Sequence, residues 1–301
     1  MNAALVRKKH RRFDPVMVII YMITCLFAII CVYPLWYVFI GSVSPFDTFS
    51  ASRAAILPTG FSLRYYESVV NTRSFRTAFM ISALKTFSGT FGMIAITSSL
   101  AYAVSKAHLH GMKFINIYII ITMYFGGTII QYYLLYSNLK LLDTFWVMVL
   151  PSFVSPWTFI VMRNYFGNNI PPDLENAAMI DGANEARIFV QIIIPITKPI
   201  FASMILFSAV GHWNDWTSFT YYCKSYSLQP FVSVLQNLLR NPNMLSRIFD
   251  TGEVSAGTFV VPPPTALKYT VIMCAMLPIM AVYPFLQKYF AQGVLIGAVK
   301  E

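Results

Sequence analysis

Long apolar runs constrain this chain more than any other feature of its sequence. A spanning helix needs about 20 mostly apolar residues, and six stretches meet that length. They are 16–41, 75–104, 114–136, 144–165, 200–222 and 269–290. Only 11% of the 301 residues are charged, whereas a soluble domain usually carries about 25%. The sequence therefore predicts an all-α, polytopic integral membrane protein with six transmembrane helices.

The distribution of basic residues predicts the orientation of these spans. The N-terminus is basic from Arg7 to Arg12, and Lys and Arg are enriched in cytoplasmic loops. The first run is long enough to span and lacks a small-residue cleavage site, so we expect a retained span and not a signal peptide. Alternation then places 105–113 and 166–199 in the cytoplasm and 42–74, 137–143 and 223–268 outside.

Three parts follow from this orientation. They are a cytoplasmic basic N-terminus at 1–15, a six-helix membrane domain at 16–291 and a cytoplasmic tail at 292–301. The formal net charge of +10 would suggest a nucleic-acid partner in a soluble protein. Here the basic residues lie in loops and at the ends of apolar runs, so we expect contact with membrane lipid and no nucleic acid.

A mixed polar and apolar interval at 171–199 separates the fourth and fifth spans. Pro172 suits the first turn of a helix, where its missing N–H costs nothing. Asp181-Gly182 is a turn and helix-stop signal, because Gly accepts the left-handed conformation. A second short amphipathic piece follows and ends near Pro195. The interval therefore predicts a helical hairpin outside the bilayer.

This hairpin resembles the EAA loop of permease subunits in binding-protein-dependent ABC importers. The residues that carry the resemblance, and that it implies couple the chain to an ATPase, are Glu175, Ala177, Ala178, Asp181, Gly182, Ala183, Ile192 and Pro195. Pro195 follows Gly182 by 13 positions, as in that family. Without the resemblance, an interfacial hairpin with no partner would be the simpler explanation.

The resemblance implies a fold and a set of partners. The fold is that of a type I ABC importer permease, in which a cytoplasmic coupling-helix hairpin joins two of six transmembrane helices. The partners are a homologous second permease, an ATPase subunit dimer, an extracellular or periplasmic solute-binding protein and an oligosaccharide substrate, at the bacterial cytoplasmic membrane. No Walker A pattern occurs in the sequence, so ATP and Mg²⁺ belong to the ATPase. We expect this chain to bind no cofactor and to be no enzyme.

A second informative stretch is Gly211-His212-Trp213-Asn214-Asp215-Trp216. Polar side chains inside a span are expected to face a cavity or one another. Aromatic rings stack on the C–H faces of sugars while polar groups bind hydroxyls. The stretch also resembles the Trp-Asn motif of maltose-type carbohydrate permeases. We therefore expect the substrate pathway to include His212, Trp213, Asn214, Asp215 and Trp216; an interfacial aromatic belt is the alternative.

Ionisable residues in the spans raise two further hypotheses. His212 and Asp215 are three positions apart, which on a helix would place them on one face and suggests a proton relay. A relay needs further ionisable groups, and the neighbouring spans offer few. Lys85 in the second span must snorkel, pair or meet water, and we favour snorkelling or pairing over substrate contact. The small residues around it predict a central position in the bundle.

The third apolar run is interrupted by Gly126-Gly127 and Gln131. Such residues indicate a helix break or a polar lumen. Gln131 and Tyr132 are therefore candidates for the substrate pathway, and a bond from Gln131 to a neighbouring helix is an equal alternative. In the outer segments, Leu63 and Tyr66 resemble a pattern that the permease family places in a short interfacial helix, and an ordinary loop fits equally well. The segment 231–240 suggests a short amphipathic helix.

An oligosaccharide-importing ABC permease is thus the expected function. Arginines on or near the outer side suggest an acidic, uronate-containing saccharide, and a neutral sugar is an equal alternative, with these charges binding lipid or the solute-binding protein instead. They are Arg53, Arg64, Arg73, Arg76, Arg240 and Arg247. The competing class is a secondary transporter driven by an ion gradient. Only Lys85, His212 and Asp215 favour it.

Overall fold

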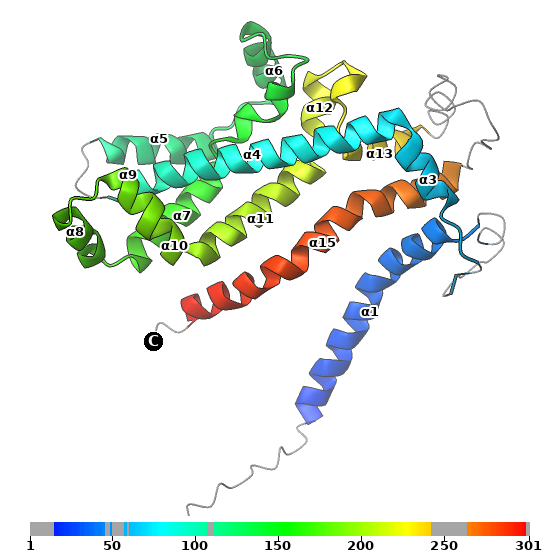
Figure 1. Ribbon diagram of the computed structural model, residues 1–301, viewed down its shortest axis with the longest axis horizontal. Coiled ribbons are helices and arrows are strands. Elements are labelled where there is room, and N and C mark those ends of the chain that lie inside the picture. The colour runs from blue at the N-terminus through cyan, green and yellow to red at the C-terminus, as the bar shows by residue number, and fades with distance from the viewer. Residues whose placement is uncertain are drawn as a thin grey trace, which may run out of the picture.

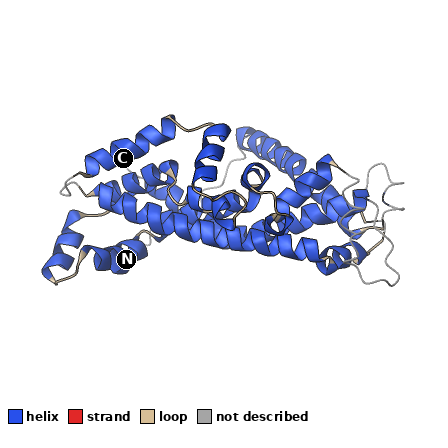
Figure 2. Cartoon of the chain, turned by 90° about the horizontal axis from the view of Figure 1, so that it is seen from above, coloured by secondary structure: helices blue, strands red, loops and turns tan. Residues whose placement is uncertain are grey.

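The computed structural model describes residues 15–45, 49, 57–58, 60–106, 111–241 and 264–298. Within those ranges every regular element is a helix (Figure 2), which confirms the predicted all-α class. The basic stretch from Arg7 to Arg12, together with Arg53, Arg247 and the last three residues, lies outside the described residues.

The longest central element is α4 (Arg73–Ser105), which runs the length of the bundle (Figure 1). α7 (Pro156–Asn169) and α11 (Lys198–Asn214) pack along it. This arrangement confirms the central position that its small residues predicted.

Glycines let side chains of neighbouring elements approach α4 closely. A Cβ on Gly89 would collide with the imidazole of His212 on α11, and one on Gly92 would collide with the ring of Phe153. Both contacts therefore depend on the absence of a side chain, as is common where membrane helices pack closely.

α1 (Pro15–Val43) and α15 (Pro264–Ala298) lie on the other side of the bundle, where the C-terminal part of α1 contacts the start of α15 and the two helices then diverge (Figure 1). The Phe49 ring centroid lies 5.2 Å from that of Tyr37 and 5.5 Å from that of Tyr269. Along most of α1 the apolar side chains are exposed. Such a surface is compatible with a bilayer and not with water.

The predicted span 114–136 is wrong as a single helix, although the expected break is confirmed. It is divided into α5 (Met112–Tyr124) and α6 (Ile129–Asn138). Gln131 has a role that neither alternative anticipated: its Oε1 accepts the backbone N–H of Thr128 at 2.7 Å, as half of the capping box that starts α6. Such a box satisfies backbone donors that the first turn of a helix leaves free.

The predicted spans 144–165 and 200–222 are not uninterrupted α-helices, although Phe145–Asn169 as a whole is long and apolar enough to cross a membrane. The first begins as two 3-10 turns, Phe145–Met148 and Leu150–Ser152, before α7. Prolines cause this, since Pro151 and Pro156 cannot donate a backbone hydrogen bond. The second breaks after Asn214 and resumes as α12 (Thr217–Tyr222).

By length and hydropathy, four segments of the described part can each cross a membrane. They are Pro15–Val43, Arg73–Ser105, Phe145–Asn169 and Thr265–Pro284. A fifth is obtained if Glu185–Ile196 and Lys198–Asn214, which meet at 87°, count as one span. The sixth predicted span is the divided run 114–136, so the count of six stays a prediction.

Two short helices lie at the end of the bundle where α4 begins (Figure 1). α3 (Arg64–Asn71) shows that the predicted interfacial segment is helical, and α13 (Phe231–Arg240) has the predicted bounds. The apolar face of α13, with Phe231 and Leu238, packs into one cluster with α4 and α15.

Candidate functional site

The polar hairpin begins with α8 (Pro172–Ile180) and turns sharply at its end. Gly182 has φ of +82°, and its N–H donates to the carbonyl of Met179 at 3.0 Å. The N–H of Ala183 donates to the carbonyl of Ala178, also at 3.0 Å. This pair of bonds is the Schellman motif, in which a left-handed glycine ends a helix.

The second arm returns the chain to the bundle. α9 (Glu185–Ile188) is capped by Asn184, whose Oδ1 accepts the N–H of Arg187 at 2.8 Å. A π-helical turn, Phe189–Ile193, and α10 (Ile194–Ile196) follow. The proline in α10 has no N–H to donate and crowds the preceding turn, and the chain then bends into α11.

The predicted coupling residues divide between two faces of this hairpin. Glu175 and Ala178 are buried, and Ala183 and Ile192 are half-buried against the cluster formed with α4 and α7. Ala177, Asp181, Gly182 and Pro195 are exposed. Beside them on α8 projects Ile180, which is 86% exposed and which the sequence reasoning did not single out. The exposed side of α8 therefore carries Ile180 together with the less exposed Leu174 and Met179.

A buried ion pair joins α4 to the break between α11 and α12. The Nζ of Lys85 donates to Oδ2 of Asp215 at 2.7 Å, to the carbonyl of Asp215 at 2.7 Å and to Oγ of Ser218 at 3.0 Å. All three ammonium donors are therefore satisfied. Lys85 is fully buried, so pairing is how the chain accommodates it.

Asp215 also begins α12. Its Oδ1 accepts the N–H of Thr217 at 3.0 Å and that of Ser218 at 3.2 Å. These bonds satisfy donors at a helix N-terminus. The carboxylate of Asp215 thus stabilises the start of α12 at the break in the fifth predicted span, and it also neutralises Lys85.

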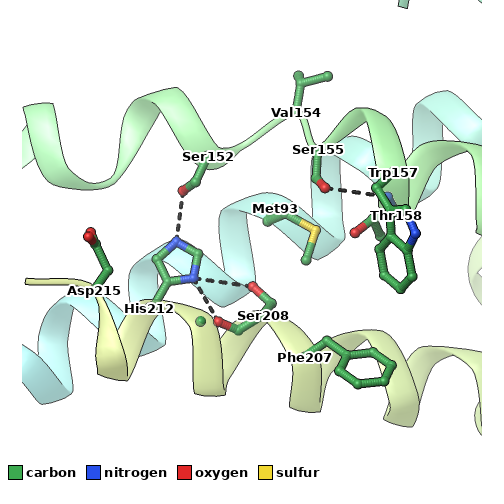
Figure 3. A pocket seen from close by; sticks show the side chains of 11 residues that line it. Met93, Ser152, Val154, Ser155, Trp157, Thr158, Phe207, Ser208, His212 and Asp215 are labelled. Atoms are coloured by element: carbon green, nitrogen blue, oxygen red, sulfur yellow. Dashed lines mark hydrogen bonds between the residues drawn. The ribbon is translucent and has the colours of Figure 1, made fainter. Parts of the chain in front are cut away.

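A cavity of about 480 Å³ opens next to this ion pair (Figure 3). Its polar wall includes His212, whose Nδ1 donates to the carbonyl of Ser208 at 2.9 Å and whose Nε2 lies 2.7 Å from Oγ of Ser152. The hydroxyls of Ser155 and Thr158 and the ring of Trp157 also line it. The cavity therefore offers hydroxyl, imidazole and aromatic surfaces together.

Of the predicted pathway residues, His212 and Asp215 line this cavity. They do not share a helix face, because α11 ends at Asn214 and Asp215 is extended, with ψ of 105°. Their side chains bind different partners, His212 on Ser152 and Asp215 on Lys85. The helical juxtaposition on which the proton-relay hypothesis depended is therefore absent.

The other predicted pathway residues lie elsewhere. Trp213 is buried and its Nε1 donates to the carbonyl of Ala275 on α15 at 2.8 Å. Asn214 bonds to its own helix, Trp216 lies under the guanidinium of Arg240 at 5.0 Å, and Tyr132 stacks on Tyr136 of α6. The structure does not bring these side chains to the cavity with His212.

Sequence reasoning missed Ser152, Ser155 and Trp157 as cavity residues. The available signal was the pair of prolines, Pro151 and Pro156, inside an apolar run. Non-helical backbone at membrane depth is tolerated where it is buried in protein or lines a water-filled cavity. Polar residues beside such prolines are therefore candidates for a cavity wall.

The contact between Gly89 and His212 gives a testable expectation. Gly89→Ala should destabilise the protein by about 1–3 kcal/mol, because the added methyl collides with the imidazole and displaces it from its hydrogen bonds with Ser152 and Ser208. Gly167→Ala is the matched control, since a Cβ there meets open space on α7 and Ala favours a helix. Thermal unfolding of the purified protein compares them. Equal unfolding temperatures for both variants would contradict the close packing.

The chain is similar to known proteins in sequence and in structure. No protein-family model matches the chain. It is 33% identical over 292 residues to the polygalacturonan/rhamnogalacturonan transport system permease protein YtcP of Bacillus subtilis (strain 168), covering 97% of this chain and 99% of that one. It is 37% identical over 272 residues to Protein LplC of the same organism, covering 90% of both chains. A solved bacterial ABC transporter involved in the import of the acidic polysaccharide alginate matches with a TM-score of 0.81 and 25% identity, over 93% of this chain and 99% of that one.

Proposed function

The chain belongs to the permease subunits of sugar-importing ABC transporters, and on that premise we propose that an oligosaccharide crosses the membrane through the cavity beside His212 while an ATPase binds the α8–α9 hairpin. Permeases of this family are membrane-embedded and are not themselves enzymes. The family also implies an ATPase, a solute-binding protein and a second permease. The roles that we propose for individual residues are additional to what membership of the family implies.

The cavity carries the proposal for the substrate pathway. It lies where two predicted spans are broken, at Leu150–Ser152 and after Asn214. Broken helices at membrane depth favour a water-filled cavity. A sugar needs hydrogen-bonding groups for its hydroxyls and a ring surface for its C–H face. The hydroxyls of Ser155 and Thr158 and the ring of Trp157 supply these chemistries, while both ring nitrogens of His212 already bond to Ser208 and Ser152.

The outward face of α8 supports the proposal for the ATPase contact. Ile180 is a large apolar side chain that is 86% exposed, next to Ala177, which is exposed and small. Residues of this kind on a short helix fit an apolar groove of a partner. We infer that this face, with the turn at Gly182, is what the ATPase contacts, and that the hairpin and both termini are cytoplasmic.

An acidic saccharide is the substrate class we propose. The alginate transporter and the polygalacturonan permease are named for acidic polymers, and this chain places arginines near its outer end. Arg240 lies over Trp216, with 5.0 Å between the guanidinium carbon and the ring centroid. An arginine stacked on an aromatic ring keeps its donors free for a carboxylate. A neutral sugar has no carboxylate with which this guanidinium could form an ion pair.

Substrate-stimulated ATP hydrolysis tests both parts of the proposal. The assembled transporter, with its solute-binding protein, is reconstituted and given uronate oligomers or neutral oligosaccharides of equal length. We expect uronate oligomers to stimulate hydrolysis and neutral ones to do so weakly. Equal or greater stimulation by neutral sugars would remove the acidic class. Uptake that follows an ion gradient without nucleotide would contradict the coupling itself.

A further inference from the structure

Glu175 on α8 is turned into the protein. It is 6% exposed, and its Oε1 forms an ion pair with the Nζ of Lys106, the residue that follows α4. The hydroxyl of Tyr102, on the last turn of α4, lies 3.3 Å from the same oxygen. Two side chains at the end of α4 therefore hold the start of α8.

Tyr102 also reaches the second arm of the hairpin. Its hydroxyl lies 3.4 Å from Oε2 of Glu185 on α9, and its ring centroid lies 5.0 Å from that of Phe189 in the π-helical turn. On the other side its ring meets Phe166 of α7 edge-on at 6.1 Å. One side chain of α4 thus contacts both arms of the hairpin and the adjacent helix.

The same helix carries the contacts of the central site. Lys85 and Gly89 lie on α4, where they meet Asp215 and His212. With a rise of about 1.5 Å per residue, Lys85 and Tyr102 are about 26 Å apart along one continuous helix. A continuous helix held by polar contacts at its C-terminal end and in its middle can carry a displacement from the hairpin to the cavity.

We propose that Tyr102, Lys106, Glu175 and Glu185 form an internal joint through which the hairpin moves α4, and that Glu175 therefore acts inside the permease and not as a contact to the ATPase. The inference rests on the proposed coupling through the hairpin and names its positioning residues. Lys106 neutralises Glu175, and the single hydroxyl proton of Tyr102 is offered to either carboxylate. The exposed side of α8 around Ile180 is then the surface that contacts the ATPase.

A charge exchange in the full transporter complex tests the joint. Lys106→Glu and Glu175→Lys, made singly, each place like charges in contact, and each should lower substrate-stimulated ATP hydrolysis about tenfold, within the usual range for coupling between sites. The ATPase should still co-purify. The double variant, Lys106→Glu with Glu175→Lys, should recover most of the stimulation. Recovery will be partial, because a lysine is disfavoured near the N-terminus of α8.

Control variants separate this joint from ordinary structural effects. Lys113→Glu changes an exposed lysine at the start of α5, on the same side of the bundle, and should keep wild-type stimulation. Tyr102→Phe removes one hydroxyl and keeps the ring packing, so it should lower stimulation without lowering the unfolding temperature; wild-type stimulation would overturn the role of the hydroxyl. Loss of the ATPase from Glu175→Lys complexes, with no recovery in the double variant, would place Glu175 at the ATPase and overturn the joint. It would leave the proposed coupling intact.

Discussion

Asp215→Asn is expected to destabilise the permease by about 3–5 kcal/mol, the usual cost when one partner of a buried ion pair is removed. The substitution preserves the shape of the side chain and removes its charge. Lys85 is fully buried, whereas the side chain of Asp215 is 29% exposed. The remaining ammonium would therefore face a protein interior with no countercharge. Thermal unfolding of the purified complex measures the loss, and transport should fall with it.

The reverse change should be milder, and the pair together milder still. Lys85→Met leaves a carboxylate that keeps some solvent and the donors of Thr217 and Ser218. The double variant, Lys85→Met with Asp215→Asn, has no buried charge to compensate. We expect the single Asp215 variant to unfold at the lowest temperature of the three. If Lys85→Met were as damaging as Asp215→Asn, the asymmetry in burial would not govern this site.

Local patterns predicted the elements that depend on local chemistry. The turn at Gly182 followed from the need for a left-handed residue after a short helix, and φ there is +82°. α13 was predicted within its observed bounds because its apolar positions recur at helical spacing. The small residues of α4 predicted its central place, which depends only on how closely backbones can approach.

The features that the sequence did not predict depend on contacts between segments that are far apart in the chain. Asp215 is held by Lys85, 130 positions earlier, and that bond keeps it in the break and off the helix face that spacing alone suggested. Trp213 looked like a sugar-binding ring, yet its Nε1 is taken by the carbonyl of Ala275 on α15. Hydropathy reports which segments are apolar and not where they break, so the cavity wall at Ser152 was missed.

Gly182→Val is expected to reduce transport and substrate-stimulated ATP hydrolysis by about tenfold or more. The left-handed conformation costs an L residue about 1–2 kcal/mol, and a β-branched side chain is a stronger outlier there; each 1.4 kcal/mol is about a factor of ten in an equilibrium. A Cβ at this position meets open space, so the strain is in the backbone alone. Relieving it requires the Schellman bonds to Met179 and Ala178 to break, which changes the direction in which the second arm leaves α8.

Two further variants make this expectation sharp. Gly111 has φ of +83° and open space around its Cβ position, so Gly111→Val imposes the same kind of strain in another turn, before α5. Gly111→Val should lower the stability of the protein without reducing transport or substrate-stimulated ATP hydrolysis as Gly182→Val does. Gly182→Asn should retain most activity, because asparagine tolerates the left-handed region. Equal transport by Gly182→Val and Gly111→Val, measured at equal protein levels in the membrane, would show that the shape of the hairpin does not control coupling.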